Sequence, residues 1–259
     1  MSGYLLCVYR ARNADNVLAL LEQARTARCT PRLWALDEVE PRLSRWTQGV
    51  GPGDRSHLIN TLAADLPRSG WLVVADDDVR FEVGSLRRFL RIARLVGLDL
   101  CQPAHAPSSQ RSHDKLVVQT HLHVRLTRFV EIGPLFAVSP RWRSRVIPMP
   151  EDLNMGWGTD VLWSDLHAAG CRLGVVDDVT MVHLTPTGAS YDVDEPWLAF
   201  RALLNERGVE NLDDLIATLS CWPHGKVLPG WSIPWLGRIW EKQKLRRPVE
   251  HAKPDEEAV

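Results

Sequence analysis

Residues 71–78, Trp71-Leu72-Val73-Val74-Ala75-Asp76-Asp77-Asp78, decide the fold of this chain. An apolar run of this length, without polar alternation, is typical of a strand covered on both faces, as in a parallel sheet. In open α/β sheets, ligands bind where the strands reach their carboxyl ends. The three acids that end the run are therefore expected at a ligand-binding edge.

Asp76 and Asp78 form an Asp-x-Asp pair at the end of this strand. Neighbouring carboxylates repel one another, and water or a divalent cation reduces that cost. Oxygen ligands at this spacing suit Mg²⁺ or Mn²⁺ shared with the phosphates of a nucleotide. The alternative is an acidic loop that caps the next helix, with Asp78 in a turn. Side chains that point away from each other here, or a strand end filled by a lysine or arginine partner, would overturn the metal interpretation.

The first 80 residues alternate strands and helices. Strands are predicted over residues 4–9, 32–36 and 71–76, and helices over residues 14–27 and from Asp54 or Ser56 to Leu66. This order predicts a parallel sheet with right-handed crossovers, which is the form of a nucleotide-binding half-domain. The sequence has no Gly-x-Gly-x-x-Gly after the first strand and no Walker loop, which argues against a dinucleotide dehydrogenase and a P-loop enzyme.

The rest of the chain mixes helices with shorter strands. Helices are predicted over residues 84–96, 159–169, 197–207 and 212–219, and strands over 98–102, 117–126, 131–138, 173–176 and 179–184. A polar loop is predicted over 103–115. A helical, aromatic extension is expected over 192–245, and the charged, proline-containing tail 246–259 is expected to be disordered.

Composition limits the class of protein. The 259 residues carry a formal net charge of −1, so no nucleic-acid footprint is evident. The five cysteines are scattered without a Cys-x-x-Cys, which favours a reduced, cytoplasmic compartment. We expect no signal peptide and no membrane span. The aromatic stretch 231–240, with basic residues after it, predicts packing onto the domain, peripheral contact with a membrane, or contact with another copy.

The segment Gly156-Trp157-Gly158-Thr159-Asp160 is the second informative motif. Two glycines around a tryptophan predict a tight turn that presents a flat apolar face, on which a sugar ring can stack. Asp160 falls in the first turn of the next predicted helix, where an acid also stabilises the helix dipole. Trp157 as ordinary core is the competing interpretation, and two nearby acids, Glu151 and Asp152, compete with Asp160 for any catalytic role.

Histidines mark three further places. His183 ends the apolar run 180–184, where a structural role competes with metal ligation beside the paired aspartates. His121 and His123 lie on one face of a predicted strand. They could bind a metal as a pair, line a sugar pocket, or be plain strand surface. No cysteine or further acid at ligand spacing joins that pair. His224 and Lys226 belong to a proline-rich loop that either closes over a diphosphate or is plain surface.

The motifs, taken in order, resemble one known family. They are Asp76-Asp77-Asp78, Cys101-Gln102-Pro103-Ala104, Phe129-Val130-Glu131, Pro134-Leu135-Phe136, Asp152-Leu153-Asn154-x-Gly156-Trp157-Gly158-x-Asp160 and Gly174-Val175-Val176-Asp177-x-x-x-x-Val182-His183. This order, over residues 71–184, resembles the DUF707 family, whose members have a GT-A-type glycosyltransferase fold. The resemblance implies a mixed, mainly parallel, Rossmann-like central sheet flanked by helices.

The resemblance also implies a function and a division of the chain. It implies a metal-dependent glycosyltransferase that takes a nucleotide-diphosphate sugar, with uridine as the default base, and a hydroxyl or amine acceptor. Residues 1–191 would be the catalytic domain, with the nucleotide-binding half over 1–80 and the acceptor half over 81–191. The metal, Mn²⁺ or Mg²⁺, is assigned to Asp76, Asp78 and His183.

Other roles follow from the same resemblance and from position. Asp160 is assigned as the general base of an inverting displacement. The donor contacts are assigned to Asp37, Asp76, Asp77, Arg10, Arg55 and Lys226, with Arg12 as a further candidate, and the acceptor contacts to Trp157, Gly156, Glu131 and His113. A nucleotidyltransferase is one alternative, although the region after the first strand lacks a glycine-rich loop. A non-catalytic nucleotide- or carbohydrate-binding protein is the other, and the retained acids argue against it.

Overall fold

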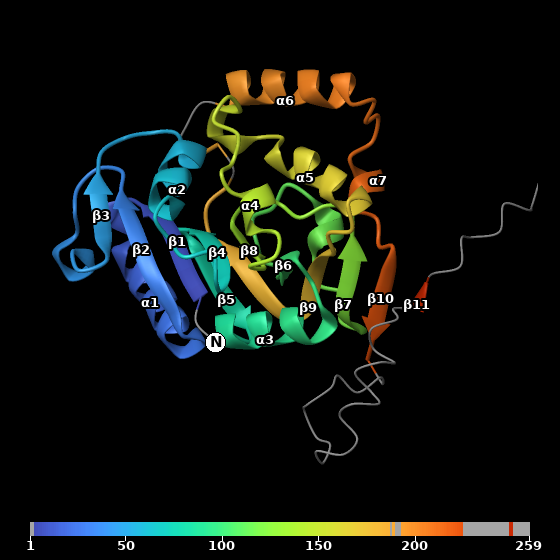
Figure 1. Cartoon of the computed structure of the whole chain (residues 1–259), viewed down its shortest axis with the longest axis horizontal. Helices are drawn as coiled ribbons and strands as arrows, with labels where there is room; N and C mark the ends of the chain where they lie inside the picture. The colour runs from blue at the N-terminus through green and yellow to red at the C-terminus, as the bar shows by residue number, and fades with distance from the viewer. Residues whose placement is uncertain (1–2, 187, 190–192, 225–248, 251–259) are drawn as a thin grey trace, which may run out of the picture.

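The computed structural model describes residues 3–186, 188–189, 193–224 and 249–250 (Figure 1). Lys226, the aromatic stretch 231–240 and nearly all of the tail 246–259 lie outside these residues, so what is predicted for them stays a prediction. None of the helices in the described part of the chain combines the length and the apolarity that a membrane-spanning segment needs.

Strands and helices alternate through the first half of the chain, as the sequence predicts. The strands are β1 (Gly3–Tyr9), β2 (Cys29–Ala35), β3 (Thr47–Val50), β4 (Trp71–Asp76), β5 (Val79–Val83), β6 (Leu100–His105), β7 (Leu122–Thr127), β8 (Leu135–Val138), β9 (Leu173–His183), β10 (Ser220–Pro223) and β11 (Val249–Glu250). The α-helices are α1 (Ala14–Ala27), α2 (Arg55–Ala63), α3 (Leu86–Val96), α4 (Arg143–Val146), α5 (Thr159–Ala168), α6 (Asp194–Glu206) and α7 (Asp213–Ile216).

The described strands form one mixed sheet in the order β11-β10-β7-β9-β6-β8-β4-β1-β2-β3, and β5 pairs with β9. Strands β4, β1, β2 and β3 run parallel. Strand β8 is antiparallel to both β4 and β6, and β6 is parallel to β9. Strands β1, β2, β4, β6 and β9 therefore point the same way, and their carboxyl ends share one edge of the sheet.

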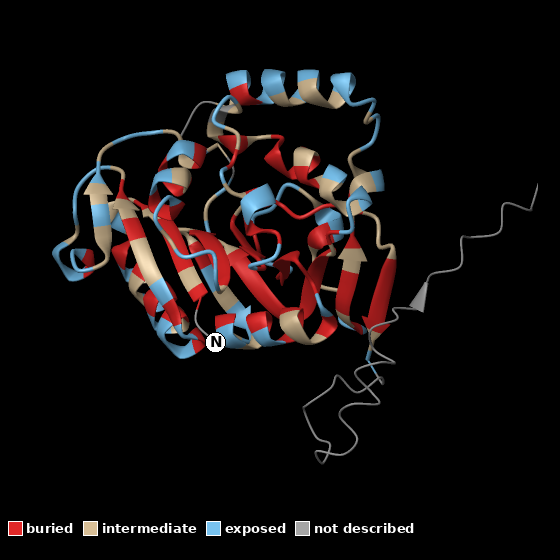
Figure 2. Cartoon of the chain, in the orientation of Figure 1, coloured by how far each residue is buried: buried red, intermediate tan, exposed pale blue. Residues whose placement is uncertain are grey.

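Helices cover both faces of the sheet, and β4 is buried between them (Figure 2). Trp71 and Val73 belong to the apolar cluster that α1 and α3 complete on one face. Leu72 and Val74 belong to the cluster that α2 and α5 complete on the other face. This arrangement explains why the run has no polar alternation, since both faces of the strand are packed.

The strands in the second half are shorter than predicted. The strand expected over 117–126 is β7, which begins at Leu122, because the N–H of Leu122 closes a turn with the Gln119 carbonyl at 2.9 Å. The strand expected over 131–138 is β8, which begins at Leu135. The Glu131 N–H donates to the Gln102 side chain at 2.7 Å instead of to a neighbouring strand. Side chains and turns thus satisfy backbone groups that the pattern assigned to a sheet.

Other boundaries are corrected by pairing between distant segments. The polar loop expected from residue 103 begins later, because β6 continues through Pro103 to His105, with a register shift at the proline. The two strands expected over 173–176 and 179–184 are one strand, β9. The helix expected over 212–219 is α7, which ends at Ile216, and β10 follows it. Strands β3, β5 and β10 were not predicted, because each is short and depends on a distant partner.

Candidate active site

A cavity of about 660 Å³ lies at the shared carboxyl edge of the parallel strands. Asp76, Asp77 and Asp78 line it at the end of β4, His105 at the end of β6, and His183 at the end of β9. Its volume is in the range of small-molecule sites, and its position is the one that α/β topology favours for ligands. The ligand-binding edge predicted from the sequence is thus where the structure has a cavity.

Arg55, from the start of α2, binds Asp76. Its Nε and Nη2 lie 2.9 and 2.8 Å from Asp76 Oδ1, and Nη2 also donates to the Ile132 carbonyl at 3.0 Å. The arginine is in place because Asp54 caps α2 by accepting the Ser56 N–H at 2.8 Å. This is the arginine partner that counts against a metal at Asp76, and it occupies the Oδ1 atom of that carboxylate.

Asp78 and His183 form the second pair at this edge, with 3.2 Å between Asp78 Oδ1 and His183 Nε2. Burial by itself would raise the pKa of Asp78, but the hydrogen bond and charge of His183 outweigh it and hold that pKa below its usual value. Burial likewise acts to lower the pKa of His183, but the Asp78 carboxylate outweighs it and raises that pKa. The two far-separated motifs therefore meet, as the sequence analysis expected.

The Asp76, Asp78 and His183 side chains fit a divalent cation in their chemistry. One ligand atom from each lies within 4.8 Å of the others, and an ion between them would replace the direct contact of Asp78 with His183. The oxygen of Asp76 that Arg55 does not bind, Oδ2, lies 2.8 Å from where a Cβ on Gly133 would be. The bare glycine therefore leaves room for that oxygen. Two carboxylates with an imidazole favour Mn²⁺ over Mg²⁺, which prefers oxygen ligands alone.

Asp77 has a structural environment. Its Oδ2 accepts the Arg10 N–H at 2.7 Å, and Asn13 adds a side-chain hydrogen bond. Burial, as the main cause, raises its pKa, and those two donors oppose the shift. Asp77 thus holds the segment after β1 against the end of β4. Its assignment as a donor contact has less support than that of its neighbours, because its polar partners belong to the protein.

Asp37 follows β2 and is exposed at the rim of the cavity. Its Oδ1 accepts the N–H groups of Ala11 and Glu38 at 2.9 and 2.8 Å. Partial burial acts to raise its pKa, but these two donors together outweigh it and lower the pKa. Asp37 therefore stays ionised beside the backbone N–H groups after β1, in a position to accept hydrogen bonds from a nucleobase or ribose.

Asp160 is buried in the first turn of α5 and also lines the cavity. Its Oδ1 accepts the Val161 N–H at 2.9 Å. Burial, reinforced by the nearby charge of Glu131, raises its pKa to about 7. A carboxyl with a pKa near neutrality can take up a proton during a reaction and release it afterwards. Among the acidic residues proposed from the sequence, Asp160 therefore has the chemistry of a general base.

Glu131 belongs to a buried chain of hydrogen bonds. Its Oε2 lies 2.6 Å from His105 Nε2, and His105 Nδ1 lies 2.8 Å from Ser109 Oγ, which accepts the His183 N–H at 2.9 Å. His113 Nε2 is 4.0 Å from the other Glu131 oxygen. Burial lowers the pKa of His113, with Glu131 opposing the shift. The chain of contacts connects Glu131, in the wall of the cavity, to the end of β9.

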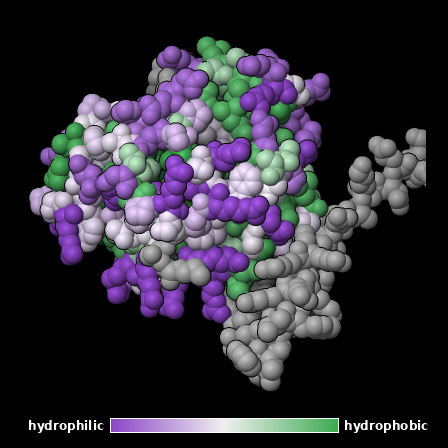
Figure 3. All heavy atoms as spheres, viewed as in Figure 1, coloured by the Kyte–Doolittle hydropathy of each residue, from purple (hydrophilic) through white to green (hydrophobic). Residues whose placement is uncertain are grey.

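Trp157 faces α6 at the side of the cavity. Its ring centroid lies 6.3 Å from those of Trp197 and Phe200, both with edge-on geometry. Gly158, with φ of +95°, allows this approach, because a Cβ there would come within 2.5 Å of Leu203. Apolar side chains gather near α6 on the face drawn in Figure 3. Helix α6 therefore belongs to the site, whereas the sequence analysis placed it in a separate extension.

Three other residues considered in the sequence analysis do not line the cavity. Gly156 is buried behind it, where a Cβ would come within 2.5 Å of Ile132, so it shapes the turn and offers no surface to an acceptor. Glu151 binds His57 and Asn60 on the outer side of α2, at 2.9 and 2.8 Å. Asp152 is exposed. Neither acid lines the cavity, which leaves the catalytic assignment to Asp160.

Among the cavity-lining residues that the sequence analysis did not assign to the site are His105, Trp197 and Phe200. His105 lay in a predicted loop, and only the pairing of β6 with β9 shows it to be buried at the site. Trp197 and Phe200 line the cavity from α6. Their i, i+3 spacing marks an apolar helix face, but that pattern does not say which surface the face covers.

Solved structures resemble the fold over most of the chain. The TarS structure from S. aureus matches with a TM-score of 0.51 and 12% identity, over 83% of this chain and 41% of TarS. GalNAc-T7 matches with a TM-score of 0.56 and 10% identity, over 79% of this chain and 48% of that protein. The fold is that of GT-A glycosyltransferases. At these identities the likeness concerns the fold alone, and this chain spans less than half of either protein.

No family model and no curated protein matches the chain. The resemblance to the DUF707 family therefore stays a resemblance, whereas the mixed α/β fold that it implied is confirmed by the structure and its neighbours.

Proposed function

We propose that this protein transfers a sugar, with inversion, from a nucleoside-diphosphate sugar to a hydroxyl or amine acceptor. The observation that carries the proposal is Asp160, a buried carboxyl with its pKa raised to about 7, in the same cavity as Asp78 and His183. A proton acceptor and a diphosphate-binding edge in one cavity are the two elements that a direct displacement at a sugar carbon requires.

The donor is placed at the ends of β1, β2 and β4. Asp37 accepts hydrogen bonds at the rim, and Arg55 offers positive charge beside Asp76. Arg55 Nη1 is buried and has no hydrogen-bond partner within the described residues, so the guanidinium keeps one unused donor at this edge of the cavity. TarS has been solved with UDP and with UDP-GlcNAc, and GalNAc-T7 with UDP, GalNAc and Mn²⁺. These complexes make uridine nucleotides and Mn²⁺ the first ligands to test.

The acceptor enters from the side that Trp157 and α6 form. Trp157 provides an apolar face for a sugar ring, and α6 limits the access of water to that part of the cavity. Asp160 removes the proton from the acceptor oxygen or nitrogen as that atom attacks the anomeric carbon, and the nucleoside diphosphate leaves from the opposite side. Asp78 and His183 would hold a divalent cation that offsets the charge on the departing diphosphate.

The test measures release of UDP from a panel of UDP-sugars with Mn²⁺, with and without sugar acceptors. Asp160→Asn should lower turnover by about 100-fold or more. Asp152→Asn, an exposed change a few residues earlier, should leave it near the wild-type level. Full activity in Asp160→Asn, or undiminished activity with EDTA present, would overturn the proposed mechanism.

The same assay separates the alternatives. Pyrophosphate formed from a nucleoside triphosphate and a sugar phosphate would identify a nucleotidyltransferase. Tight binding of UDP-sugars without any release of UDP, over all acceptors, would identify a binding protein.

A further inference from the structure

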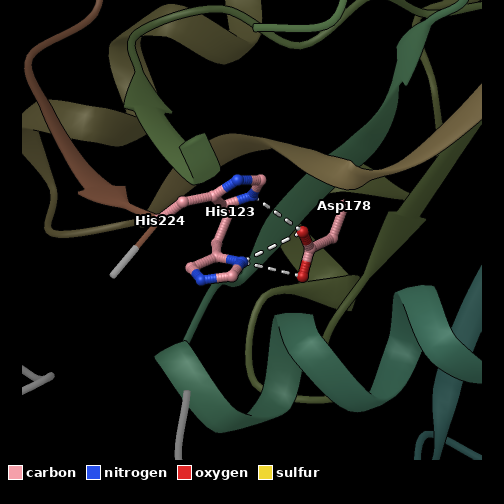
Figure 4. A group of neighbouring side chains, drawn as sticks. All are labelled: His123, Asp178 and His224. Atoms are coloured by element: carbon pink, nitrogen blue, oxygen red, sulfur yellow. Dashed lines mark hydrogen bonds and ion pairs between the residues drawn. The ribbon is translucent and has the colours of Figure 1, made fainter. Parts of the chain in front are cut away.

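A second group of side chains with metal-ligating chemistry lies outside the cavity, on three adjacent strands. His123 comes from β7, Asp178 from β9 and His224 from the residue after β10 (Figure 4). His123 Nδ1 lies 3.0 Å from both Asp178 oxygens, and His224 Nε2 lies 3.3 Å from Asp178 Oδ1. None of the three lines the cavity of the candidate active site.

The sheet brings these residues together from distant parts of the sequence. Strand β7 pairs with β9 on one side and with β10 on the other. The His224 N–H donates to the His121 carbonyl at 2.8 Å, which fixes the end of β10 beside the start of β7. The sequence pattern offered His121 and His123 as a pair, but the structure separates them, because His121 is exposed and outside the group.

Asp178 and its neighbour Asp177 have different partners. Asp177 forms a two-point ion pair with the buried Arg125, at 2.9 and 3.0 Å. Asp178 instead faces the two imidazoles, and the pairing of β9 with β6 is irregular at this point, where the register passes from Val176 to Thr180. An irregularity of this kind redirects a side chain. One acid is therefore committed to the core, and the other is held against two histidines.

The distances in the group suit a shared ion. In a tetrahedral zinc site with bonds of about 2.0–2.1 Å, ligand atoms stand roughly 3.3 Å apart. The nitrogens of both histidines approach the same oxygen, Asp178 Oδ1, at 3.0 and 3.3 Å. Arg88 lies 3.4 Å from the other oxygen, Oδ2. Oδ1 is thus available as a single-point ligand, and Arg88 can keep its contact while a metal is bound.

We propose that His123, Asp178 and His224 bind a zinc-class transition-metal ion that ties the end of β10 to β7 and β9. Two imidazoles with one carboxylate are typical ligands of Zn²⁺ and neighbouring divalent metals, and they differ from the acid-rich group in the cavity. The two rings also contact each other, with their centroids 4.2 Å apart, and each turns a nitrogen toward the same carboxylate. The site is independent of the proposed sugar transfer.

The test uses the full chain, freed of metal with a chelator and titrated with Zn²⁺ by calorimetry and with Co²⁺ by visible absorption. His183→Ala serves as the background, because it removes one ligand of the cavity group and leaves this one intact. In that background we expect one Zn²⁺ per chain and the absorption of four-coordinate Co²⁺. Adding His224→Ala should weaken Zn²⁺ binding at least tenfold and abolish that absorption, and His123→Ala should act alike.

His121→Ala is the matched control, since it removes an exposed histidine from the same segment without touching the group. It should retain the wild-type affinity and stoichiometry. His224 is 47% exposed, so its replacement leaves the core intact, which a thermal melt of the metal-free variant checks. Equal Zn²⁺ affinity in His224→Ala, His123→Ala and His121→Ala would overturn the proposal, as would the absence of any bound Zn²⁺ at millimolar concentration.

Discussion

Burial in the protein raises the pKa of the Asp160 carboxyl to about 7. Because a base must be ionised to accept a proton, kcat/KM should rise with pH through about 7 and then level off, tracking the pKa of the free protein. Below that region the rate should fall about tenfold per pH unit. Initial rates of UDP release over a pH series check this. A profile that is flat between about pH 5.5 and 8 would show that Asp160 is not the base.

The raised pKa of Asp160 also lowers the stability of the folded protein at neutral and higher pH. Below the unfolded value, near 3.8, both states hold the proton and nothing is lost. As pH rises from 3.8 toward about 7, the Asp160 carboxyl ionises in the unfolded protein, whereas the folded protein keeps it protonated. The free energy of unfolding therefore falls over this range. Asp160→Asn should therefore be more stable than wild type by about 1–4 kcal/mol near pH 8, and by much less near pH 4. Urea unfolding at both values measures the difference, and equal stability at the higher pH would contradict it.

Glu131 tunes the same group, because its charge is the second cause of the raised pKa of Asp160. Glu131→Gln removes that charge while an amide oxygen can still accept from His105. The midpoint of the pH–rate profile should then move to lower pH. Ser108→Ala, an exposed change outside the buried chain, should leave the midpoint in place. A midpoint that stays put or moves up in Glu131→Gln would show that another group governs the profile.

At the scale of single residues, the sequence predicted which side chains gather at the site better than it predicted their partners. Asp78, His183 and Asp160 meet in one cavity as expected. The pairing of Asp76 with Arg55 depends on the Asp54 cap, which the sequence indicated as a helix start, and on Gly133; neither tells which acid Arg55 will meet. Ion-pair partners are set by tertiary distance, which periodicity and spacing do not contain.

At the scale of elements, α6 meets the turn before α5 at Gly158. This residue has a φ of +95°, and an added Cβ would come within 2.5 Å of Leu203. Gly158→Ala should therefore strain the backbone and also push the Leu203 side chain of α6 out of its place. Gly170 has a similar φ of +91° with nothing within 4 Å of an added Cβ, so Gly170→Ala carries the backbone strain alone.

The comparison of these two variants isolates the contact of α6. Gly158→Ala should lose about 1–3 kcal/mol more stability than Gly170→Ala, because the added Cβ also meets the Leu203 side chain. It should also raise the KM for the acceptor, whereas Gly170→Ala should not. Denaturant unfolding and acceptor titrations measure the two effects. Equal losses in both variants, with equal KM, would mean that α6 does not depend on this close approach.

The elements that the sequence predicted well are those whose signal is local. Helix α1 begins and ends where its apolar spacing and the following residues place it, and β1 and β4 follow from apolar runs, whereas β2, predicted over 32–36, begins earlier at Cys29 and ends at Ala35. Strands β5 and β10 have few residues and are stabilised by β9 and β7, far away in sequence. The mixed half of the sheet therefore holds most of the wrong boundaries, although β2 and the end of α2 at Ala63 also differ from the prediction.

At the scale of the whole molecule, the proposed donor edge and the proposed zinc group occupy different parts of one sheet, and ligand linkage can separate them. A ligand that binds only the folded state raises its stability by about 2.7 kcal/mol at 100 times its Kd. UDP with Mn²⁺ should therefore raise the Tm by roughly 5–10 °C, and each ligand alone should raise it less, if Asp78 and His183 hold a cation against the diphosphate.

The two metal groups predict opposite responses in paired variants. His183→Ala should lose the joint effect of UDP and Mn²⁺ on the Tm, because a ligand of the cavity group is missing, but it should keep the stabilisation by Zn²⁺. His224→Ala should keep the joint effect and lose the stabilisation by Zn²⁺. Thermal melts of both variants with each ligand give the four results. If the Tm of His183→Ala responded to UDP and Mn²⁺ like that of wild type, the cation would have to lie elsewhere. Without His183, the cavity group keeps only Asp78 and Asp76 as ligands, and Asp76 is already bound by Arg55.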